Sequence, residues 1–205
     1  MITGATGNLG GQTLQFVLER AGSKNVSAIA RNPSRLASFV ERGVQVTKAD
    51  YDDKQSLVKA FRGTELLYFV SGNDVFRRLI QHENVVSAAK EAGVTHVVYT
   101  SLQCRNETES SPVMPIASVH LQTEKWLKES GLKYTILKNN LYTEFIPVFT
   151  GPDVLDRGMI YLPAGDGRIS YASRTDMAEA FAMILTTEGH ENKIYGISGT
   201  RSYSY

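Results

Sequence analysis

Three glycines near the start of the chain constrain its fold more than any other feature. They lie in Gly4-Ala-Thr-Gly7-Asn-Leu-Gly10, between a short extended run at 1–3 and a segment of helical periodicity at 10–20. Glycines at a strand–helix turn let an anion approach the backbone, because no Cβ stands in the way. The first helical turn adds unpaired N–H groups and a positive dipole end. A plain turn of small residues has the same spacing, but the context favours a dinucleotide-binding loop with contacts from Gly4, Thr6, Gly7, Asn8, Leu9 and Gly10.

Extended and helical patterns alternate through the first 140 residues. Short β-branched or aromatic runs predict strands at residues 26–30, 44–47, 65–70, 96–100 and 134–137. Amphipathic stretches predict helices at 10–20, 55–61, 79–92 and 117–129, each followed by a glycine in the C-cap region (Gly22, Gly63, Gly93 and Gly131). The later strands are nearly all apolar, as in a parallel sheet covered on both faces. The pattern predicts an α/β fold: a doubly wound parallel sheet of the Rossmann type.

The rhythm changes after about residue 140. We expect a helix at 141–155, two short strands at 159–162 and 169–171 around a turn at 163–167, a helix at 176–185 capped by Thr175, and a strand at 194–197. We therefore predict a cofactor-binding domain at 1–140 and a small α/β substrate-side region at 141–205, interleaved with the sheet. The short first strand and the missing closing helix indicate that both ends are incomplete.

Composition excludes several classes of protein. The 22 Lys and Arg nearly balance the 21 Asp and Glu, so charge predicts neither a nucleic-acid partner nor a membrane-surface partner. Four scattered His and one Cys, Cys104, predict no metal cluster and no internal disulfide, which is typical of the cytoplasm. No apolar run approaches the length of a membrane span, and no signal peptide precedes the glycine loop.

The residues after the second predicted strand indicate which dinucleotide is bound. An NAD-preferring domain has an acidic residue at that strand end to hold the ribose 2′-hydroxyl. This chain has Arg31 there, with Arg35 one turn further on. Guanidinium groups hold a 2′-phosphate that a carboxylate would repel, so the sequence predicts NADP(H). The alternative is that Arg31 only solvates a loop.

Two further strand ends are expected to line the cofactor. Asp50 and Tyr51 follow the third strand, where Asp50 could accept from the adenine amine and Tyr51 could cover the ring; alternatively, this acidic stretch begins a helix. Ser71 and Gly72 end the next strand, beside the first strand at the switch point of the sheet. We expect Ser71 and Gly72 to line the ribose.

The Tyr-x-x-x-Lys pair of short-chain dehydrogenases is missing from the helix that should carry it. Its one match, Tyr134 and Lys138, falls in a predicted strand, where four residues span roughly 13 Å. The helix at 117–129 offers His120 and Glu124 at the same spacing. His120 is therefore a candidate acid whose pKa Glu124 would raise, unless the pair only packs beneath the nicotinamide. Loss of the tyrosine also favours acceptors such as quinones, whose product can take its proton from water.

Several motifs together resemble the NmrA-like atypical short-chain dehydrogenases, most closely their quinone- and dye-reducing members. They are the run from Ile2 to Gly10, Arg31-Asn-Pro, Ala49-Asp-Tyr51, Tyr99-Thr-Ser-Leu102, His120-Leu-Gln-Thr-Glu-Lys125, Leu137-Lys-Asn-Asn-Leu-Tyr-Thr-Glu144, Ala164-Gly-Asp-Gly-Arg168 and Glu188-Gly-His-Glu-Asn-Lys193. The resemblance covers essentially the whole sequence, although family chains continue well beyond Tyr205.

The resemblance implies roles for the strand ends at 100–101 and 137–142. Thr100, Ser101, Lys138 and Asn139 would contact NADP(H), with residues 137–142 along the nicotinamide. Asn139 and Asn140 would meet the carboxamide or the substrate, and Tyr142 would stack near the ring. Family members often have Arg where Lys138 stands, which puts its contact in doubt.

Three functions remain open at this point. The first is an NADPH-dependent oxidoreductase that transfers hydride to a quinone or a similar conjugated electrophile, with His120, Asn140 and Tyr142 as candidate catalytic residues. The second is a non-catalytic NADP(H)-binding redox sensor. The third, a sugar-nucleotide epimerase, needs a tyrosine acid that the sequence does not place. A homodimer is left open.

Overall fold

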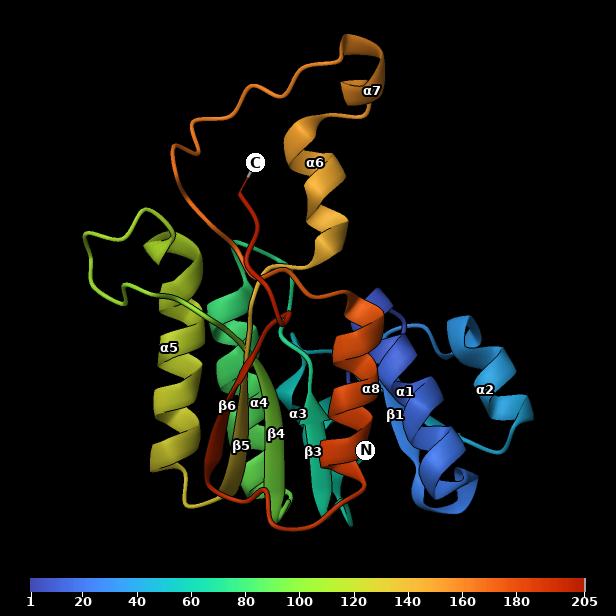
Figure 1. Ribbon diagram of the computed structural model, residues 1–205. Helices are drawn as coiled ribbons and strands as arrows, with labels where there is room; N and C mark the ends of the chain where they lie inside the picture. Colours follow the sequence, from blue (N-terminus) through green and yellow to red (C-terminus); the bar gives the residue numbers. More distant parts are fainter. Residues whose placement is uncertain (205) are drawn as a thin grey trace.

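A parallel sheet forms the centre of the fold, which we describe for residues 1–204 of a computed structural model (Figure 1). Its strands are β1 Ser27–Ala30, β2 Gln45–Lys48, β3 Leu66–Phe69, β4 His96–Leu102, β5 Lys133–Asn139 and β6 Lys193–Ile197. β1 pairs with β2, and β3, β4, β5 and β6 pair in that order, all parallel. Each predicted strand before residue 140, and the strand at 194–197, is confirmed within a few residues at each end.

The N-terminal residues join the two groups of strands. Ile2 forms parallel bridges to Ala28 and to Tyr68, and the Thr3 amide donates to the Tyr68 carbonyl at 3.0 Å. The order is therefore β2, β1, the segment 1–3, β3, β4, β5 and β6. The chain winds outward in both directions from this segment, which confirms the predicted doubly wound sheet and places a switch point above residues 3–4.

Helices cover both faces of the sheet. The helices α3 Lys54–Phe61, α4 Arg78–Glu91 and α5 Met114–Glu129 pack side by side on one face, and α1 Asn8–Ala21 and α8 Arg174–Leu185 pack together on the other. Each predicted helix before residue 140 is confirmed, with its ends shifted by at most three residues. A 3-10 turn at Pro33–Leu36 and the short α2 Ala37–Glu41 were not predicted.

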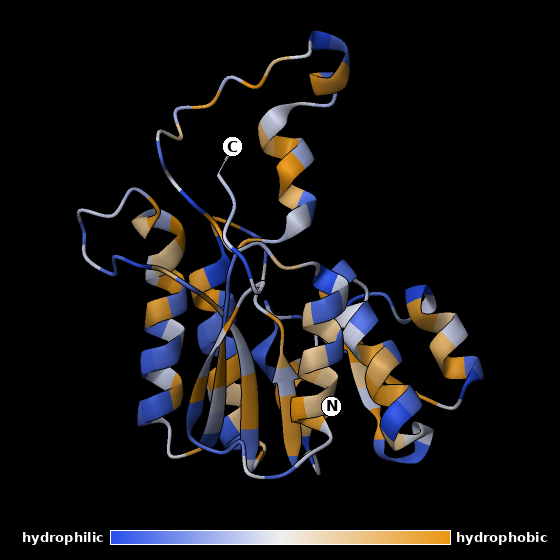
Figure 2. Cartoon of the chain, viewed as in Figure 1, coloured by the Kyte–Doolittle hydropathy of each residue, from blue (hydrophilic) through white to orange (hydrophobic). Residues whose placement is uncertain are grey.

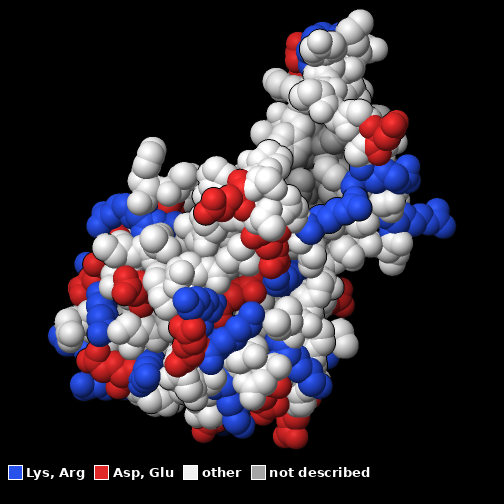
Figure 3. All heavy atoms as spheres, turned by 90° about the vertical axis from the view of Figure 1, so that its left-hand side faces the viewer, with Lys and Arg blue, Asp and Glu red and all other residues white. Residues whose placement is uncertain are grey.

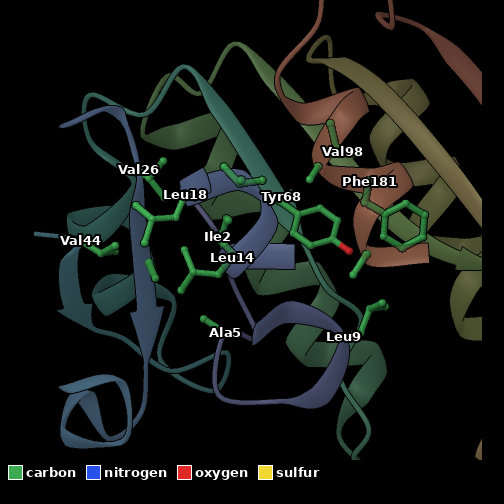
Figure 4. Close-up of a cluster of buried hydrophobic side chains, with 14 of the residues drawn as sticks. Ile2, Ala5, Leu9, Leu14, Leu18, Val26, Val44, Tyr68, Val98 and Phe181 are labelled. Atoms are coloured by element: carbon green, nitrogen blue, oxygen red, sulfur yellow. The ribbon is translucent and has the colours of Figure 1, made fainter. Parts of the chain in front are cut away.

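Strand residues alternate between two apolar cores. Tyr68 points into the core beneath α1 and α8, where it lies 6.1 Å from the Phe181 ring between centroids (Figure 4). Its neighbours Leu67 and Phe69 point into the opposite core, beneath α3, α4 and α5. Both cores are needed because the central strands bury side chains on two faces. Figure 2 accordingly shows apolar residues along the central strands and on the helices that cover them, with hydrophilic residues between them.

Residues 143–168, which we call the arm, project beyond the carboxyl ends of the strands (Figure 1). The arm contains a 3-10 turn at Thr143–Phe145, α6 Ile146–Thr150 and α7 Val154–Arg157. The expected single helix at 141–155 is wrong, because Gly151 leaves the helix with φ 87°. The expected strands at 159–162 and 169–171 are also wrong: only Ile169 forms a bridge, to Tyr203, and Tyr161 is 90% exposed.

The last helix begins earlier than predicted. Ser173, not Thr175, is its N-cap, and the Ser173 hydroxyl accepts from the Asp176 amide at 3.0 Å. Thr175 instead donates to the side chain of Gln12 on α1 at 2.7 Å. Thus α8 and β6 belong to the layered body, whereas the arm lies outside it.

Charges are mixed over one face of the body. Figure 3 shows basic and acidic side chains interspersed on the face that carries α5, while most of the arm is uncharged. Among residues 1–204, we find no helix with the length and apolar character that crossing a membrane requires.

Candidate functional site

The glycine loop leaves the start of α1 open. Gly7 is the N-cap and no side chain caps the helix, so the first-turn N–H groups keep their capacity to donate. Gly4 has φ +60°, and a Cβ on it would lie 2.9 Å from Val70 Cβ. A Cβ on Gly10 would collide with the Gly4 carbonyl. These glycines keep loop, strand and helix close together, and the cradle that they form at the switch point is of the kind that can hold a phosphate.

Two arginines stand free beside this cradle. Arg31 and Arg35 follow β1 and are exposed, and neither forms an ion pair within the part of the chain described. The Asn32 side chain fixes the turn between them by accepting from the Ser34 amide at 3.2 Å. Both guanidinium groups are therefore available to an anion.

Tyr51 is turned into the protein. Its hydroxyl donates to the Val70 carbonyl at 2.8 Å and lies 2.5 Å from Thr3 Oγ1, and burial raises its pKa. This contact ties the end of β2 to the first turn of the glycine loop. The adjacent Asp50 carboxylate accepts from the Asp52 amide at 3.1 Å, and Asp53 caps α3, as the helix-start alternative predicts. An adenine contact for Asp50 and Tyr51 stays a prediction.

The end of β3 is held by side chains from neighbouring elements. The Ser71 amide donates to Thr100 Oγ1 at 2.8 Å, and the Gly72 amide donates to His82 Nε2 at 3.0 Å. Since an amide can only donate, His82 Nε2 is an acceptor and its proton lies on Nδ1. That nitrogen lies 2.8 Å from Thr123 Oγ1. Burial, followed by the nearby His120 and Arg78, lowers the pKa of His82 to about 3.

His120 is buried and neutral. Its Nδ1 lies 2.8 Å from the Tyr99 hydroxyl, and burial, with Arg78, lowers its pKa to about 4. The prediction that Glu124 raises this pKa is wrong. Glu124 instead accepts from Ser101 Oγ at 2.6 Å, because its carboxylate faces the end of β4.

Lys138 joins the same carboxylate from β5. Its ammonium lies 3.6 Å from Glu124 and 2.6 Å from Glu107. Burial alone would lower the pKa of Lys138, but these two carboxylates outweigh it and raise the pKa. Tyr134 and Lys138 both lie in β5, so the interpretation of their spacing as a false match to the dehydrogenase pair is confirmed.

The end of β5 and the segment after it combine one unsatisfied acceptor with an aromatic stack. Asn139 is 3% exposed; its Nδ2 donates to the Tyr142 hydroxyl at 3.4 Å, while its Oδ1 has no partner. Tyr142 stacks on Phe145, and the Arg174 guanidinium lies 4.3 Å from the Tyr142 centroid. Asn140 turns back and accepts from the Leu141 amide at 2.8 Å. Asn139 thus has the acceptor that a ligand amide would satisfy.

A cleft of about 790 Å³ lies under the arm. Its walls are α6, the start of α8 and residues 198–204, represented by Thr143, Ile146, Tyr171, Ser173, Arg201 and Tyr203. The cleft is close to the segment after β5 in sequence and fold, since Tyr142 bridges to Ala172.

Sequence reasoning missed Arg78 and His82. Together with Gln81 they occupy positions i, i+3 and i+4 of α4, and all three side chains are buried. Polar residues at this spacing in the first turn of a helix, directly after the strand end at a switch point, are the signal that could have found them.

The comparisons with known proteins agree with this geometry. The model of the NmrA-like family matches residues 1–200, and the chain belongs to this family of Rossmann-type α/β proteins. Quinone oxidoreductase 2 of Escherichia coli (strain K12) is 38% identical over 203 residues, which are 99% of this chain and 69% of that protein.

Two solved structures are similar over the same extent. The NADPH-dependent quinone oxidoreductase of Escherichia coli complexed with NADPH has a TM-score of 0.91 and 38% identity, covering 99% of this chain and 70% of that one. The Citrobacter sp. triphenylmethane reductase complexed with NADP(H) has a TM-score of 0.87 and 37% identity, covering 98% and 70%.

Proposed function

We propose that this chain is an NADP(H)-dependent oxidoreductase that reduces a quinone or a similar conjugated electrophile. The observation that carries the proposal is the uncapped start of α1 behind the Gly4–Gly10 cradle, in a chain whose relatives include a quinone oxidoreductase at 38% identity. The cradle has the shape and polarity for a dinucleotide diphosphate.

The residues present suit NADP(H). The first-turn amides of α1 would hold the diphosphate, and Arg31 and Arg35 would hold the 2′-phosphate. Ser71, Gly72, Thr100 and Ser101 lie at the strand ends that would line the ribose, and Asn139 Oδ1 offers an unpaired acceptor to the carboxamide. When bound, the dihydronicotinamide supplies a hydride.

The protein's own side chains would then orient the cofactor and the acceptor rather than donate a proton. The neutral His120 ring is held by Tyr99, and Glu124 is engaged by Ser101. Neither arrangement resembles a poised proton donor, which favours an acceptor whose reduced oxygen can take its proton from water. Closeness and orientation would supply most of the acceleration.

The test measures NADPH oxidation by the purified chain with a panel of benzoquinones and naphthoquinones. The loss of NADPH absorbance monitors the reaction. We expect quinone-dependent turnover with NADPH and much slower turnover with NADH. Tight NADPH binding without turnover of any quinone would favour the redox sensor instead.

Three properties of the whole protein remain expectations. We expect a cytoplasmic protein, because Cys104 is a free thiol. A homodimer and the lack of a nucleic-acid partner stay predictions.

A further inference from the structure

Arg78 is a buried cation without a counter-charge. It is the first residue of α4 and only 8% of its surface is exposed. One guanidinium nitrogen, Nη2, donates to the Ile116 carbonyl at 3.2 Å, and Nε is buried without any partner. The preceding Arg77 pairs with Asp52 at 3.1 Å, but Arg78 forms no ion pair within residues 1–204. A buried charge left in this state is costly unless a ligand compensates it.

Three groups that feel the charge of Arg78 are themselves uncharged. Arg78 acts electrostatically on His82, His120 and Tyr99. Burial lowers the pKa of both histidines and raises the pKa of the tyrosine, so all three are neutral near pH 7. The guanidinium therefore carries a positive charge in poorly hydrated surroundings, where an anion is attracted more strongly than in water.

The position of Arg78 favours the electron acceptor, rather than a phosphate of the cofactor, as the ligand of its guanidinium. Its Cγ would lie 3.7 Å from a Cβ built on Gly72, and its guanidinium is fixed to the first turns of α5. This is the face of the sheet covered by α4 and α5, whereas the phosphate cradle opens from α1 on the other face (Figure 1). Leu79 and Ile116, beside Arg78, are 47% and 49% exposed and offer apolar contact.

We propose that Arg78 is the anion-binding residue of an acceptor site, where it takes an anionic oxygen carried by a flat apolar ligand. The proposal rests on the proposed reductase function and names how its substrate is recognised. Hydride transfer from NADPH to one carbonyl oxygen of the quinone forms an O–H bond there and leaves NADP⁺; an electron pair moves through the ring onto the second oxygen, which gives the hydroquinone monoanion. Water then protonates that oxygen. The guanidinium stabilises the oxygen while it carries the charge.

A pair of matched ligands tests the site without turnover. 2-Hydroxy-1,4-naphthoquinone is an anion at neutral pH, whereas its methyl ether has the same ring system and no charge. Calorimetry with each ligand, on the intact chain saturated with NADP⁺, measures the preference for the anion. We expect the wild-type chain to bind the anion roughly 10-fold more tightly or better, as for a hydrogen bond to a charged group.

The variants separate charge from packing. Arg78→Met and Arg78→Gln should lose the preference, and Arg78→Lys should keep part of it. Arg77→Met is the matched control: it removes the neighbouring charge, which is exposed and already paired, and should leave the preference unchanged. Circular dichroism and the melting temperature identify any variant that does not fold, and Arg78→Gln and Arg78→Lys then decide the comparison.

The outcomes distinguish this site from the proposed function. An undiminished anion preference in folded Arg78→Gln overturns the assignment, even if the wild type reduces quinones. Weaker NADPH binding with an unchanged preference also overturns it, and assigns the cation to a cofactor phosphate. Anion binding that depends on Arg78, in a chain that reduces no quinone, supports the site and rejects the reductase function.

Discussion

At the scale of single residues, Arg31 should decide between the two nicotinamide cofactors. Replacing Arg31 with Ala removes a charge-assisted contact to the 2′-phosphate, so NADPH should bind about 10-fold more weakly or worse, while NADH binding is unchanged. Isothermal calorimetry measures both affinities. Arg62→Ala, at an exposed arginine after α3, is the control and should alter neither. An equal loss for both cofactors would show that Arg31 does not contact the 2′-phosphate.

His120 should contribute little to quinone reduction. A general acid is typically worth about 100-fold or more in rate. Because burial lowers its pKa to about 4, His120 carries no proton to give as an imidazolium near pH 7. His120→Gln should therefore reduce kcat for a benzoquinone by less than about 10-fold, with an unaltered pH profile in steady-state kinetics. A 100-fold loss in kcat, together with a changed pH profile, would show that His120 acts as a general acid.

The candidate site was only partly predictable from residues. The glycine spacing and the arginine after β1 act through local backbone geometry, which the sequence carries directly. The spacing of Arg78 and His82 could have marked them as candidates, but they act across α4, α5 and β3, so their roles depend on helix packing that no local pattern encodes. The same reason explains why Glu124 accepts from Ser101 on β4 rather than pairing with His120, one turn away on α5.

At the scale of elements, Ser173 should stabilise α8. Its hydroxyl caps the helix, so Ser173→Ala should lower the free energy of unfolding by about 1 kcal/mol. Thr175→Ala is the comparison, because Thr175 bonds to the half-buried Gln12 side chain of α1 and caps nothing. Urea unfolding of both variants measures the difference. A larger loss for Thr175→Ala would place the functional cap where the sequence pattern alone puts it.

Elements with a strong apolar rhythm were predictable, and the arm was not. β3, β4 and β5 are short apolar runs because both faces of the sheet are covered, and glycines end the helices between them. In the arm, apolar residues such as Leu155 and Tyr161 are 92% and 90% exposed. The apolar pattern of the arm therefore does not correspond to a packed face within the described chain, and it does not predict regular structure there.

At the scale of the whole molecule, the buried histidines should make the fold sensitive to acid. The pKa of His82 is lowered to about 3 and that of His120 to about 4, from 6.5. As the pH falls below about 6.5, the unfolded chain takes up protons that the folded chain refuses, so stability declines until the folded histidines also titrate. Each histidine should cost about 1 kcal/mol per pH unit within this window.

The double variant His82→Gln/His120→Gln isolates this contribution. It starts from a lower stability, because it loses the contacts to Gly72 and Tyr99, but its stability should change less steeply with pH. Urea unfolding at several values between about pH 6.5 and about pH 4.5 gives the two slopes. Equal slopes for the wild type and the double variant would mean that both rings accept protons in the folded protein. The conclusion that His82 and His120 are neutral near pH 7 would then be wrong.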